Sequence, residues 1–267
     1  LKIEEFRLLG NYIVLISYDK DETITNYFSS NCDVRVIWGG DQTISNIRRS
    51  PLPPRSFDIT FADRYSLCVI NADAYLEQGD TSRISKDFYN DTYLFDQNAC
   101  TAPHLVVWLG IAANVRKAQE IFWNSLQMIV AEKYVLQPVF AVEKCVDSYR
   151  FAASSGGCHI LKMEDNLITR VQLGRLPKGI EDARSKYGYF YEYEAKTIEE
   201  IIPIVNNKFQ TIAYYGIDPT ILQNFIIVNR PNGIDRIVPI GKTLDFSLVW
   251  DGYDLIGMLS RLVFLRH

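Results

Sequence analysis

The sequence has 267 residues, 48% of them apolar and 22% charged, and this composition excludes an intrinsically disordered chain. With 28 Lys and Arg against 32 Asp and Glu, the formal net charge is −4, which argues against a basic nucleic-acid-binding face and against a polybasic membrane surface. From this charge balance we expect no nucleic-acid partner. The longest apolar stretch, Leu105 to Ala113, is too short to span a bilayer, so we also expect no membrane span.

The cysteines and histidines predict neither a disulfide framework nor a structural metal site. Five cysteines occur without a C-x-x-C pair, and the nearest Cys/His neighbours, Cys100 with His104 and Cys158 with His159, lack zinc-finger spacing. We therefore expect a reducing, cytoplasmic compartment. No secretory signal is recognised, and the sequence starts at Leu1 inside running sequence, so we expect a soluble chain or a piece of a longer one.

Strand and helix patterns alternate over the first 75 residues. Short apolar or β-branched runs predict strands at 11–18, 33–38, 57–61 and 66–72. Helical patterns lie between them at 22–30 and 41–49, with Asp41 as the N-cap of the second helix and Pro51 among the prolines that end it. This alternation indicates a parallel α/β sheet, in which we expect Asp33–Trp38 and Ser66–Ala72 to be neighbouring strands.

The alternation continues downstream. We predict helices at 82–95, 113–134, 197–206 and 219–225, and strands at 105–109, 187–193, 211–215 and 233–240. A less regular stretch with turn signals separates two of these segments, from Gln137 to Gly157. The alternating tyrosines from Tyr187 to Tyr193 are typical of sheet packing. The fold class is therefore α/β.

The turn Trp38-Gly39-Gly40-Asp41 lies between a predicted strand and a predicted helix. Two glycines there let the backbone approach a ligand closely, and the N–H groups of a helix start favour an anion. A tight strand-to-helix turn explains the same residues, because they do not complete a G-x-G-x-x-G motif.

Cys100 is the cysteine with the most suggestive surroundings. It lies in a polar loop after a predicted helix and directly before a buried strand, where a thiol can be exposed on a rigid support. A buried structural thiol is the alternative, and it is the interpretation we give to Cys68. His104 could serve as the base for Cys100, although a surface or strand-end histidine is the commoner case.

Four arginines make the segment around the prolines locally basic, and they are Arg48, Arg49, Arg55 and Arg64. They could meet the phosphates of a ligand such as coenzyme A or a dinucleotide. A solvated loop is the simpler interpretation of the same residues.

Several motifs in this order resemble the acyl-CoA reductase family typified by the reductase of bacterial bioluminescence, which is LuxC-like and a branch of the aldehyde dehydrogenase superfamily. The resemblance covers nearly the whole chain. It is carried by WGGD (38–41), ITFADRYS (59–66), FDQNAC (95–100), KYGYFYEYE (186–194) and DRIVPIGKTLDFSLVWDGYDL (235–255), with TIEE (197–200) followed by NN (206–207).

The resemblance implies roles for individual residues. In that superfamily the Phe-x-Gln-x-x-Cys pattern holds the catalytic thiol, matched here by Phe95, Gln97 and Cys100. The turn Trp38, Gly39, Gly40 and Asp41 would lie by the nicotinamide end of the cofactor. Thr60 to Asp63 stand where aldehyde-oxidising members have Glu-Leu-Gly-Gly, and Arg184 to Lys186 stand where a carboxylate binds the nicotinamide ribose.

The resemblance also implies a domain organisation. Residues 1–72 would be the C-terminal part of a dinucleotide-binding domain, 73–240 a catalytic domain and 241–267 a C-terminal segment. The N-terminal part of the dinucleotide domain, with the Asn of the oxyanion hole, would lie upstream of Leu1. The sequence would then be a piece of a longer chain, or the natural chain would be truncated there, or another chain would supply these parts. An oligomer is expected.

The implied activity is NADPH- or NADH-dependent reduction of a fatty acyl thioester to an aldehyde through an acyl-enzyme on Cys100. The donor would be acyl-CoA or an acyl-protein, with an acyl-protein synthetase as a partner. Two other functions fit the same residues: a thiol acyltransferase or thioesterase without a hydride step, and a non-catalytic fragment or scaffold chain.

Overall fold

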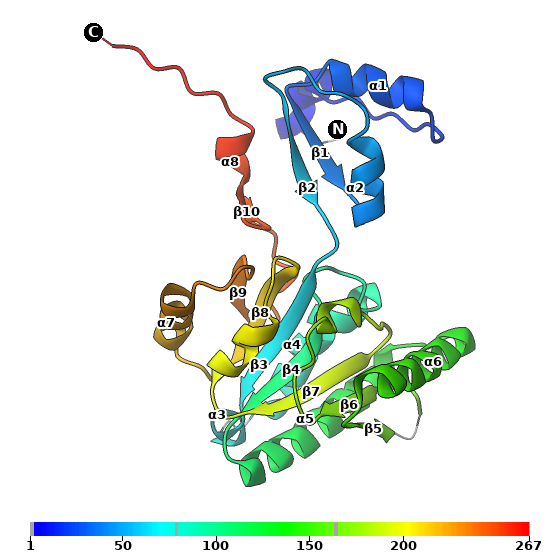
Figure 1. Cartoon of the computed structure of the whole chain (residues 1–267), viewed down its shortest axis with the longest axis vertical. Coiled ribbons are helices and arrows are strands. Elements are labelled where there is room, and N and C mark those ends of the chain that lie inside the picture. The colour runs from blue at the N-terminus through cyan, green and yellow to red at the C-terminus, as the bar shows by residue number, and fades with distance from the viewer. Residues whose placement is uncertain (1–2, 78–79, 163–164, 267) are drawn as a thin grey trace. The chain divides into compact units, whose positions relative to one another are not determined.

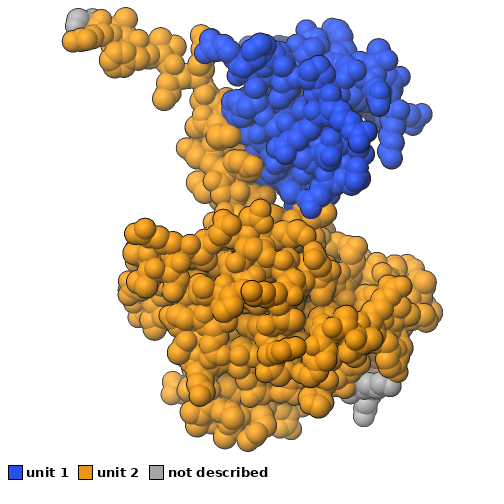
Figure 2. All heavy atoms as spheres, in the orientation of Figure 1, with its two compact units in different colours: residues 1–62 blue, residues 63–267 orange. Residues whose placement is uncertain are grey.

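The computed structural model describes residues 3–77, 80–162 and 165–266, which form two compact units, Leu1–Ala62 and Asp63–His267. Figure 1 shows the ribbon of each unit, and Figure 2 shows their atoms in separate colours. The division between these compact units falls between Ala62 and Asp63. Because of this division, the strand that follows Asp63 belongs to the larger unit.

The smaller unit is built around a two-stranded parallel sheet. β1 (Val34–Trp38) pairs with β2 (Phe57–Phe61), and α2 (Asp41–Ile47) lies in the connection between them. α1 (Glu22–Ser30) begins after Asp21, whose carboxylate accepts the backbone N–H groups of Thr23 and Ile24. α2 has Gly40 in the N-cap position, so the expected capping role of Asp41 is wrong.

One arginine joins the elements of this unit. The Arg35 side chain is largely buried, and its Nε and Nη2 donate to the two carboxylate oxygens of Asp58 at 2.7 and 3.1 Å. Its Nη1 reaches the Ser29 hydroxyl and the carbonyls of Ile47 and Ser50. Since these groups come from α1, from the end of α2 and from the loop that follows α2, the guanidinium fixes their positions on the sheet.

The strand expected at Asn11–Tyr18 is wrong. Residues Glu4–Tyr12 form a 3₁₀ helix, η1, without a buried residue, and residues 13–19 have no regular structure. None of the described strands pairs with this segment, and a strand requires a partner for its backbone groups. Its apolar side chains therefore lie exposed, with Leu15 at 93% and Val14 at 79%.

The larger unit contains a seven-stranded sheet in the order β5-β6-β7-β4-β3-β8-β9. All neighbours are parallel except β5 and β6, which form an antiparallel pair. The strands are β3 (Tyr65–Asn71), β4 (Pro103–Leu109), β5 (Cys158–Lys162), β6 (Thr169–Leu173), β7 (Tyr189–Ala195), β8 (Phe209–Tyr215) and β9 (Arg236–Pro239). The expectation that Asp33–Trp38 neighbours Ser66–Ala72 is wrong, because β1 pairs with β2 in a separate sheet.

Side chains on both faces of this sheet are buried, which is why the central strands read as continuous apolar runs. On β3, Leu67 and Val69 enter one core, and Cys68 and Ile70 enter the other. The first core also includes η3 (Ile180–Asp182), η4 (Ile198–Ile204) and α7 (Pro219–Asn229). The second includes α3 (Ala72–Glu77), α4 (Thr81–Thr92), η2 (Tyr93–Phe95) and α5 (Ala112–Lys133).

The stretch predicted to be irregular is a helix. α6 (Pro138–Ser155) begins with a proline at its first position and ends before Gly156, whose φ is +56°. Its buried residues are Lys144, Ser148 and Phe151, whereas Val139 and Val142 are exposed, so apolar residues do not mark its inner face in the sequence. Strands β5 and β6 follow it, and neither was predicted. The segment expected as a helix at 197–206 is the 3₁₀ helix η4, which contains Pro203.

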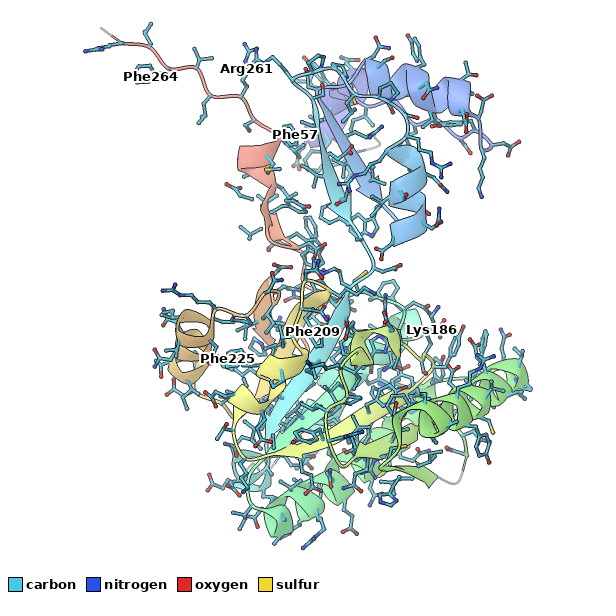
Figure 3. All side chains as sticks on the ribbon, viewed as in Figure 1. Phe57, Lys186, Phe209, Phe225, Arg261 and Phe264 are labelled. Carbon is cyan, nitrogen blue, oxygen red and sulfur yellow. The ribbon has the colours of Figure 1, made fainter. Side chains whose placement is uncertain are left out.

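The C-terminal residues form small elements and an extended tail. β10 (Val249–Trp250) and β11 (Tyr253–Asp254) pair with each other, and α8 (Leu255–Met258) precedes the tail. Figure 3 marks Arg261 and Phe264 on the tail, in contrast to Phe209 and Phe225 in the body of the unit. Phe264 is 88% exposed, while Phe209 and Phe225 are buried. Within the described ranges, no helix has the length and apolarity needed to cross a bilayer.

Candidate active site

Cys100 lies in the loop between η2 and β4, at the N-terminal end of a central strand of the sheet, and it is partly exposed. Asp96 and Gln97, which precede Cys100 in this loop, have left-handed backbone conformations with φ of +53° and +59°. Short bonds hold this turn, because the N–H of Gln97 donates to Thr92 O at 2.7 Å and that of Asn98 to Phe95 O at 2.8 Å. The thiol is thus carried by a tight, internally bonded loop.

The buried side chain of Gln97 fastens this loop to two strands. Its Nε2 donates to the carbonyls of Pro103 and Tyr189, both at 2.9 Å. Its Oε1 accepts the backbone N–H groups of Gly188 at 3.1 Å and Tyr189 at 2.9 Å. One amide therefore bonds the starts of β4 and β7, and the glutamine of the Phe-x-Gln-x-x-Cys pattern has a structural role that the sequence did not reveal.

The neighbouring Asp96 adds two contacts to the same loop. Its backbone carbonyl accepts the N–H of Tyr187 at 3.2 Å, and its carboxylate accepts the hydroxyl of Tyr134 at 2.6 Å. Gly188 must be glycine here, since its φ is +77° and a Cβ would lie 2.1 Å from the Tyr93 hydroxyl oxygen. The KYGYF motif therefore shapes the backbone against which the Cys100 loop rests.

His104 is buried and neutral. Only 1% of it is exposed, and burial, with Arg184 and Lys186 nearby, lowers its pKa to about 3. Its Nδ1 lies 3.0 Å from the Ser185 carbonyl and its ring stacks on Tyr65, while its Nε2 has no hydrogen-bond partner in the described chain. His104 is thus a buried histidine at the start of β4, which fits the strand-end alternative and not the surface one, and neither ring nitrogen hydrogen-bonds the Cys100 thiol.

The other cysteines differ from Cys100 in their surroundings. Cys68 is fully buried, and burial raises the pKa of its thiol well above the ordinary value, so its interpretation as a core residue is confirmed. Cys145 is exposed, and Cys32 and Cys158 are partly exposed. No disulfide joins any of the five, and no His, Cys, Asp or Glu cluster in the described ranges could hold a metal ion.

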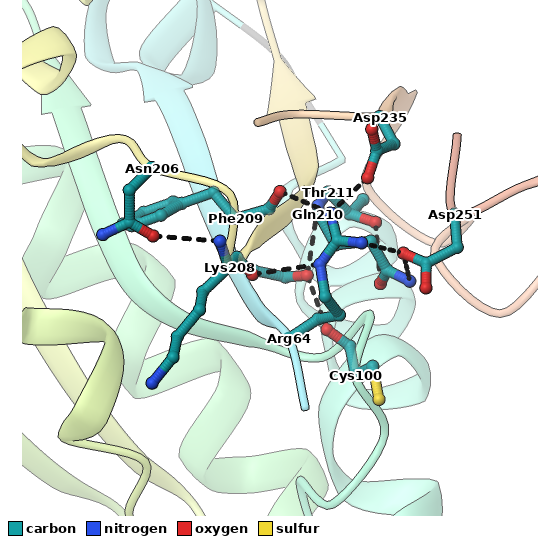
Figure 4. Close-up of polar contacts among 10 residues, drawn as sticks. Arg64, Cys100, Asn206, Lys208, Phe209, Gln210, Thr211, Asp235 and Asp251 are labelled. Carbon is teal, nitrogen blue, oxygen red and sulfur yellow. Dashed lines mark hydrogen bonds and ion pairs between the residues drawn. The ribbon is translucent and has the colours of Figure 1, made fainter. Parts of the chain in front are cut away.

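Arg64 forms a buried ionic hub beside the start of β3 (Figure 4). Its guanidinium pairs with Asp235 and with Asp251, the latter at 2.6 Å, and donates to the carbonyls of Lys208 and Phe209. It joins the starts of β3 and β8 to the segments before β9 and after β10. The solvated loop expected for the arginines is therefore wrong at Arg64, and Arg48 also pairs with a carboxylate, that of Asp58.

The turn Trp38 to Asp41 lies in the smaller unit, at the carboxyl ends of two parallel strands. Trp38 is 66% exposed, and its ring centroid lies 4.8 Å from that of Phe61, the residue opposite it on β2. A Cβ on Gly39 would lie 3.0 Å from the Thr43 side chain, so a close approach to α2 also favours glycine there. Ligands of open parallel sheets bind outside the carboxyl ends of the strands, so this position suits a dinucleotide.

The segment Thr60 to Asp63 contains one carboxylate, that of Asp63, and Arg184 Nη1 lies 3.5 Å from it. Arg184 to Lys186 contain no carboxylate. Thr60, the first residue of the former segment, is thus not a carboxylate, and the carboxylate that ends that segment is paired with Arg184.

The comparisons with known proteins agree with the motifs. Residues 3–130 match the family described as acyl-CoA reductase (LuxC). A curated relative, a long-chain acyl-protein thioester reductase from Aliivibrio fischeri, is 24% identical over 263 residues, which are 94% of this chain and 50% of the relative. The chain therefore spans about half the length of that relative.

Solved structures of aldehyde dehydrogenases share the fold. An NAD-dependent aldehyde dehydrogenase from Sinorhizobium meliloti aligns with a TM-score of 0.56 at 12% identity, over 85% of this chain and 47% of that one. A betaine aldehyde dehydrogenase from Staphylococcus aureus, solved with NAD⁺, aligns with a TM-score of 0.54 at 13% identity, over 86% of this chain and 49% of that one. The chain therefore resembles the LuxC family over residues 3–130, and it has an α/β fold like that of the aldehyde dehydrogenases.

Proposed function

We propose that the complete protein reduces a fatty acyl thioester to an aldehyde through an acyl-enzyme on Cys100, with NADPH or NADH as the reductant. The observation that carries this proposal is the Cys100 loop, which presents a partly exposed thiol beside a buried glutamine that bonds it to β4 and β7. The family match and the name of the curated relative support the substrate class.

The chemistry uses the thiol twice. The Cys100 thiolate attacks the thioester carbonyl, the C–S bond to the donor breaks, and the donor thiol leaves with a proton. Backbone N–H groups around Cys100 would stabilise the oxyanion of the tetrahedral state. When bound, the reduced nicotinamide supplies a hydride for the enzyme thioester. The resulting thiohemiacetal releases aldehyde and returns the thiol to Cys100.

Two titratable groups that the sequence or the resemblance brings near the reaction are His104 and Asp63. His104 is neutral, with one ring nitrogen on a backbone carbonyl, and Asp63 faces a guanidinium. A histidine with a pKa of about 3 and a carboxylate paired with a guanidinium are both weak bases, which supports reduction over hydrolysis. If hydrolysis of the acyl-enzyme is slow, the acyl group stays on Cys100 until the hydride reduces it.

Trp38, Gly39, Gly40 and Asp41 would hold the nicotinamide end of the cofactor. The exposed indole and the two small residues stand at the carboxyl ends of β1 and β2, the side of a parallel sheet where dinucleotides bind. The chain spans about half the length of the curated relative, so the complete protein is the form in which the proposed reaction is tested.

The acyl donor would be acyl-CoA or an acyl-protein, and an acyl-protein synthetase would then be a partner. The curated relative carries acyl-protein in its name, which favours the second donor. We propose a cytoplasmic oligomer as the working form.

Thioester-dependent NADPH oxidation in the complete protein tests the proposal. Wild-type protein should oxidise NADPH and release aldehyde when a long-chain acyl-CoA is added. Cys100→Ala should do neither, and Cys145→Ala, which removes an exposed cysteine on α6, should behave as wild type. Release of donor thiol without NADPH oxidation would indicate a thioesterase or acyltransferase. An inactive protein whose Cys100 resists alkylation would indicate a non-catalytic chain.

A further inference from the structure

The pairing of β3 slips at Ser66 on both sides of the strand. Toward β4, Ser66 pairs with Pro103 and Leu67 pairs with Leu105, so His104 is passed over. Toward β8, Tyr65 pairs with Phe209 and Leu67 with Ile212, so two residues of β8 lie opposite the single residue Ser66. Irregular pairing of this kind re-aims side chains and is frequent beside functional sites.

The hydroxyl of Ser66 fills the place where the ladder is interrupted. Ser66 is fully buried, and its Oγ donates to the backbone carbonyl of Cys100 at 2.7 Å. The same Oγ accepts the backbone N–H of Thr211 at 3.2 Å. One hydroxyl thus bonds the peptide unit that follows the Cys100 side chain to the start of β8.

The hydrogen bond from Ser66 holds the backbone of the candidate nucleophile in position. The Cys100 carbonyl belongs to the same planar peptide as the N–H of Thr101, so a bond that fixes the carbonyl also fixes the direction of that N–H. Gln97 holds the loop three residues earlier, and Ser66 holds it at the cysteine itself. Displacements of about 1 Å at a reacting group cost roughly a hundredfold in rate.

We propose that Ser66 is a positioning residue that sets the backbone of Cys100 for acyl transfer. The proposal rests on the function proposed above. Ser66 does not touch the reacting atoms, and it acts through the carbonyl of Cys100 and the peptide that this carbonyl shares with Thr101.

The test compares Ser66→Ala with Ser66→Thr, which keeps the hydroxyl, and with Ser85→Ala. Ser85 is an equally buried serine on α4 whose Oγ also donates to backbone carbonyls, those of Thr81 and Phe122. In single-turnover acylation of the complete protein by a long-chain acyl-CoA, Ser66→Ala should be at least tenfold slower. Its half-saturating acyl-CoA concentration should stay within twofold, and Ser66→Thr should recover most of the rate.

Hydrogen exchange gives a second readout that does not depend on the activity. Amides of residues 97–102 should exchange at least tenfold faster in Ser66→Ala, and at the wild-type rate in Ser85→Ala. If wild-type Cys100 is not acylated, the proposed function fails while this exchange measurement still decides the role of Ser66.

Two results would overturn the proposal. One is a Ser66→Ala protein with wild-type acylation and wild-type exchange in the loop. The other is a Ser85→Ala protein that shows the same losses, because general destabilisation would then explain them. If Ser66→Ala does not fold, Ser66→Cys replaces it, since the thiol is a weak donor of similar size and should give an intermediate loss.

Discussion

His104 shows how burial fixes the protonation state of a single side chain near the candidate nucleophile. The folded protein holds its pKa at about 3, against an ordinary value of 6.5, because the ring is buried and faces Arg184 and Lys186. Its Nδ1 then donates to the Ser185 carbonyl, and its Nε2 carries the lone pair. The neutral form is therefore part of the folded structure.

This state predicts a pH dependence of stability. Between about pH 6.5 and 3 the unfolded chain binds a proton on His104 that the folded chain excludes, so the free energy of unfolding should fall as the pH falls through this window. In His104→Asn, which keeps an amide donor but does not ionise, the slope should be flatter by up to about 1.4 kcal/mol per pH unit. Urea unfolding at pH 7.5, 6 and 5 measures both slopes, and equal slopes would contradict the neutral His104.

At the scale of elements, a buried carboxylate joins β7 to its neighbours. Glu192 accepts the indole N–H groups of Trp108 on β4 at 2.9 Å and Trp123 on α5 at 2.7 Å, and Arg170 on β6 donates to its other oxygen at 2.6 Å. The Arg170 guanidinium also stacks on Trp123, 5.0 Å from the ring centroid. Three elements thus share one side chain.

Removing one partner of the Glu192–Arg170 pair should lower the free energy of unfolding strongly. Removing both charges together should lower it less than the sum of the single changes. Glu192→Gln leaves the guanidinium of Arg170 without its carboxylate and should destabilise the protein by about 3–5 kcal/mol. The double change Glu192→Gln with Arg170→Met should recover at least about 1 kcal/mol relative to the sum of the single changes. Urea unfolding of the four proteins closes the cycle, and additive costs would mean that the pair is not coupled.

The central strands and helices could be predicted because their signals are local. β3 and β4 are apolar on both faces, and α5 has a long amphipathic period, so each was placed within a few residues. The apolar run Asn11–Tyr18 also predicts a strand from local signals. A strand needs a partner strand, however, and a local pattern does not reveal whether that partner exists. The sequence does not predict α6, because two of its three buried residues, Lys144 and Ser148, are polar while valines on it are exposed.

The site was only partly visible in the sequence. The motif singled out Cys100, but the roles of the groups around it depend on contacts between distant residues. Gln97 bonds Tyr189, Ser66 bonds Cys100, and Arg64 bonds Asp251. No periodicity or spacing encodes such pairs, because the sheet brings them together only after its strands have assembled.

At the scale of the whole chain, much apolar surface is exposed. The two-stranded sheet of the smaller unit has no third strand in the described ranges, and parallel sheets are normally covered on both faces. The exposed apolar residues of that unit include Leu8, Leu9, Tyr12, Val14, Leu15, Tyr27, Val36 and Trp38. Those of the tail include Leu262, Val263, Phe264 and Leu265. The chain spans about half the length of its curated relative.

These surfaces predict association of the 267-residue chain on its own. It should bind an apolar dye such as ANS and elute above the mass of a monomer, because exposed apolar patches beyond a few hundred Å² are unusual in monomers. Val14→Lys together with Leu15→Lys should reduce both signals without changing the unfolding of the larger unit. A monomer that binds no dye would contradict the expectation.

Peptide mass spectrometry after incubation with a long-chain acyl-CoA shows whether Cys100 carries the acyl group. The added acyl mass should map to the peptide with Cys100, be removed by hydroxylamine, and vanish in Cys100→Ala. Cys68→Ala should still be acylated and should lose about 1–2 kcal/mol of stability, because it removes a buried thiol. Acylation that persists in Cys100→Ala, with aldehyde still formed, would show that another residue is the nucleophile.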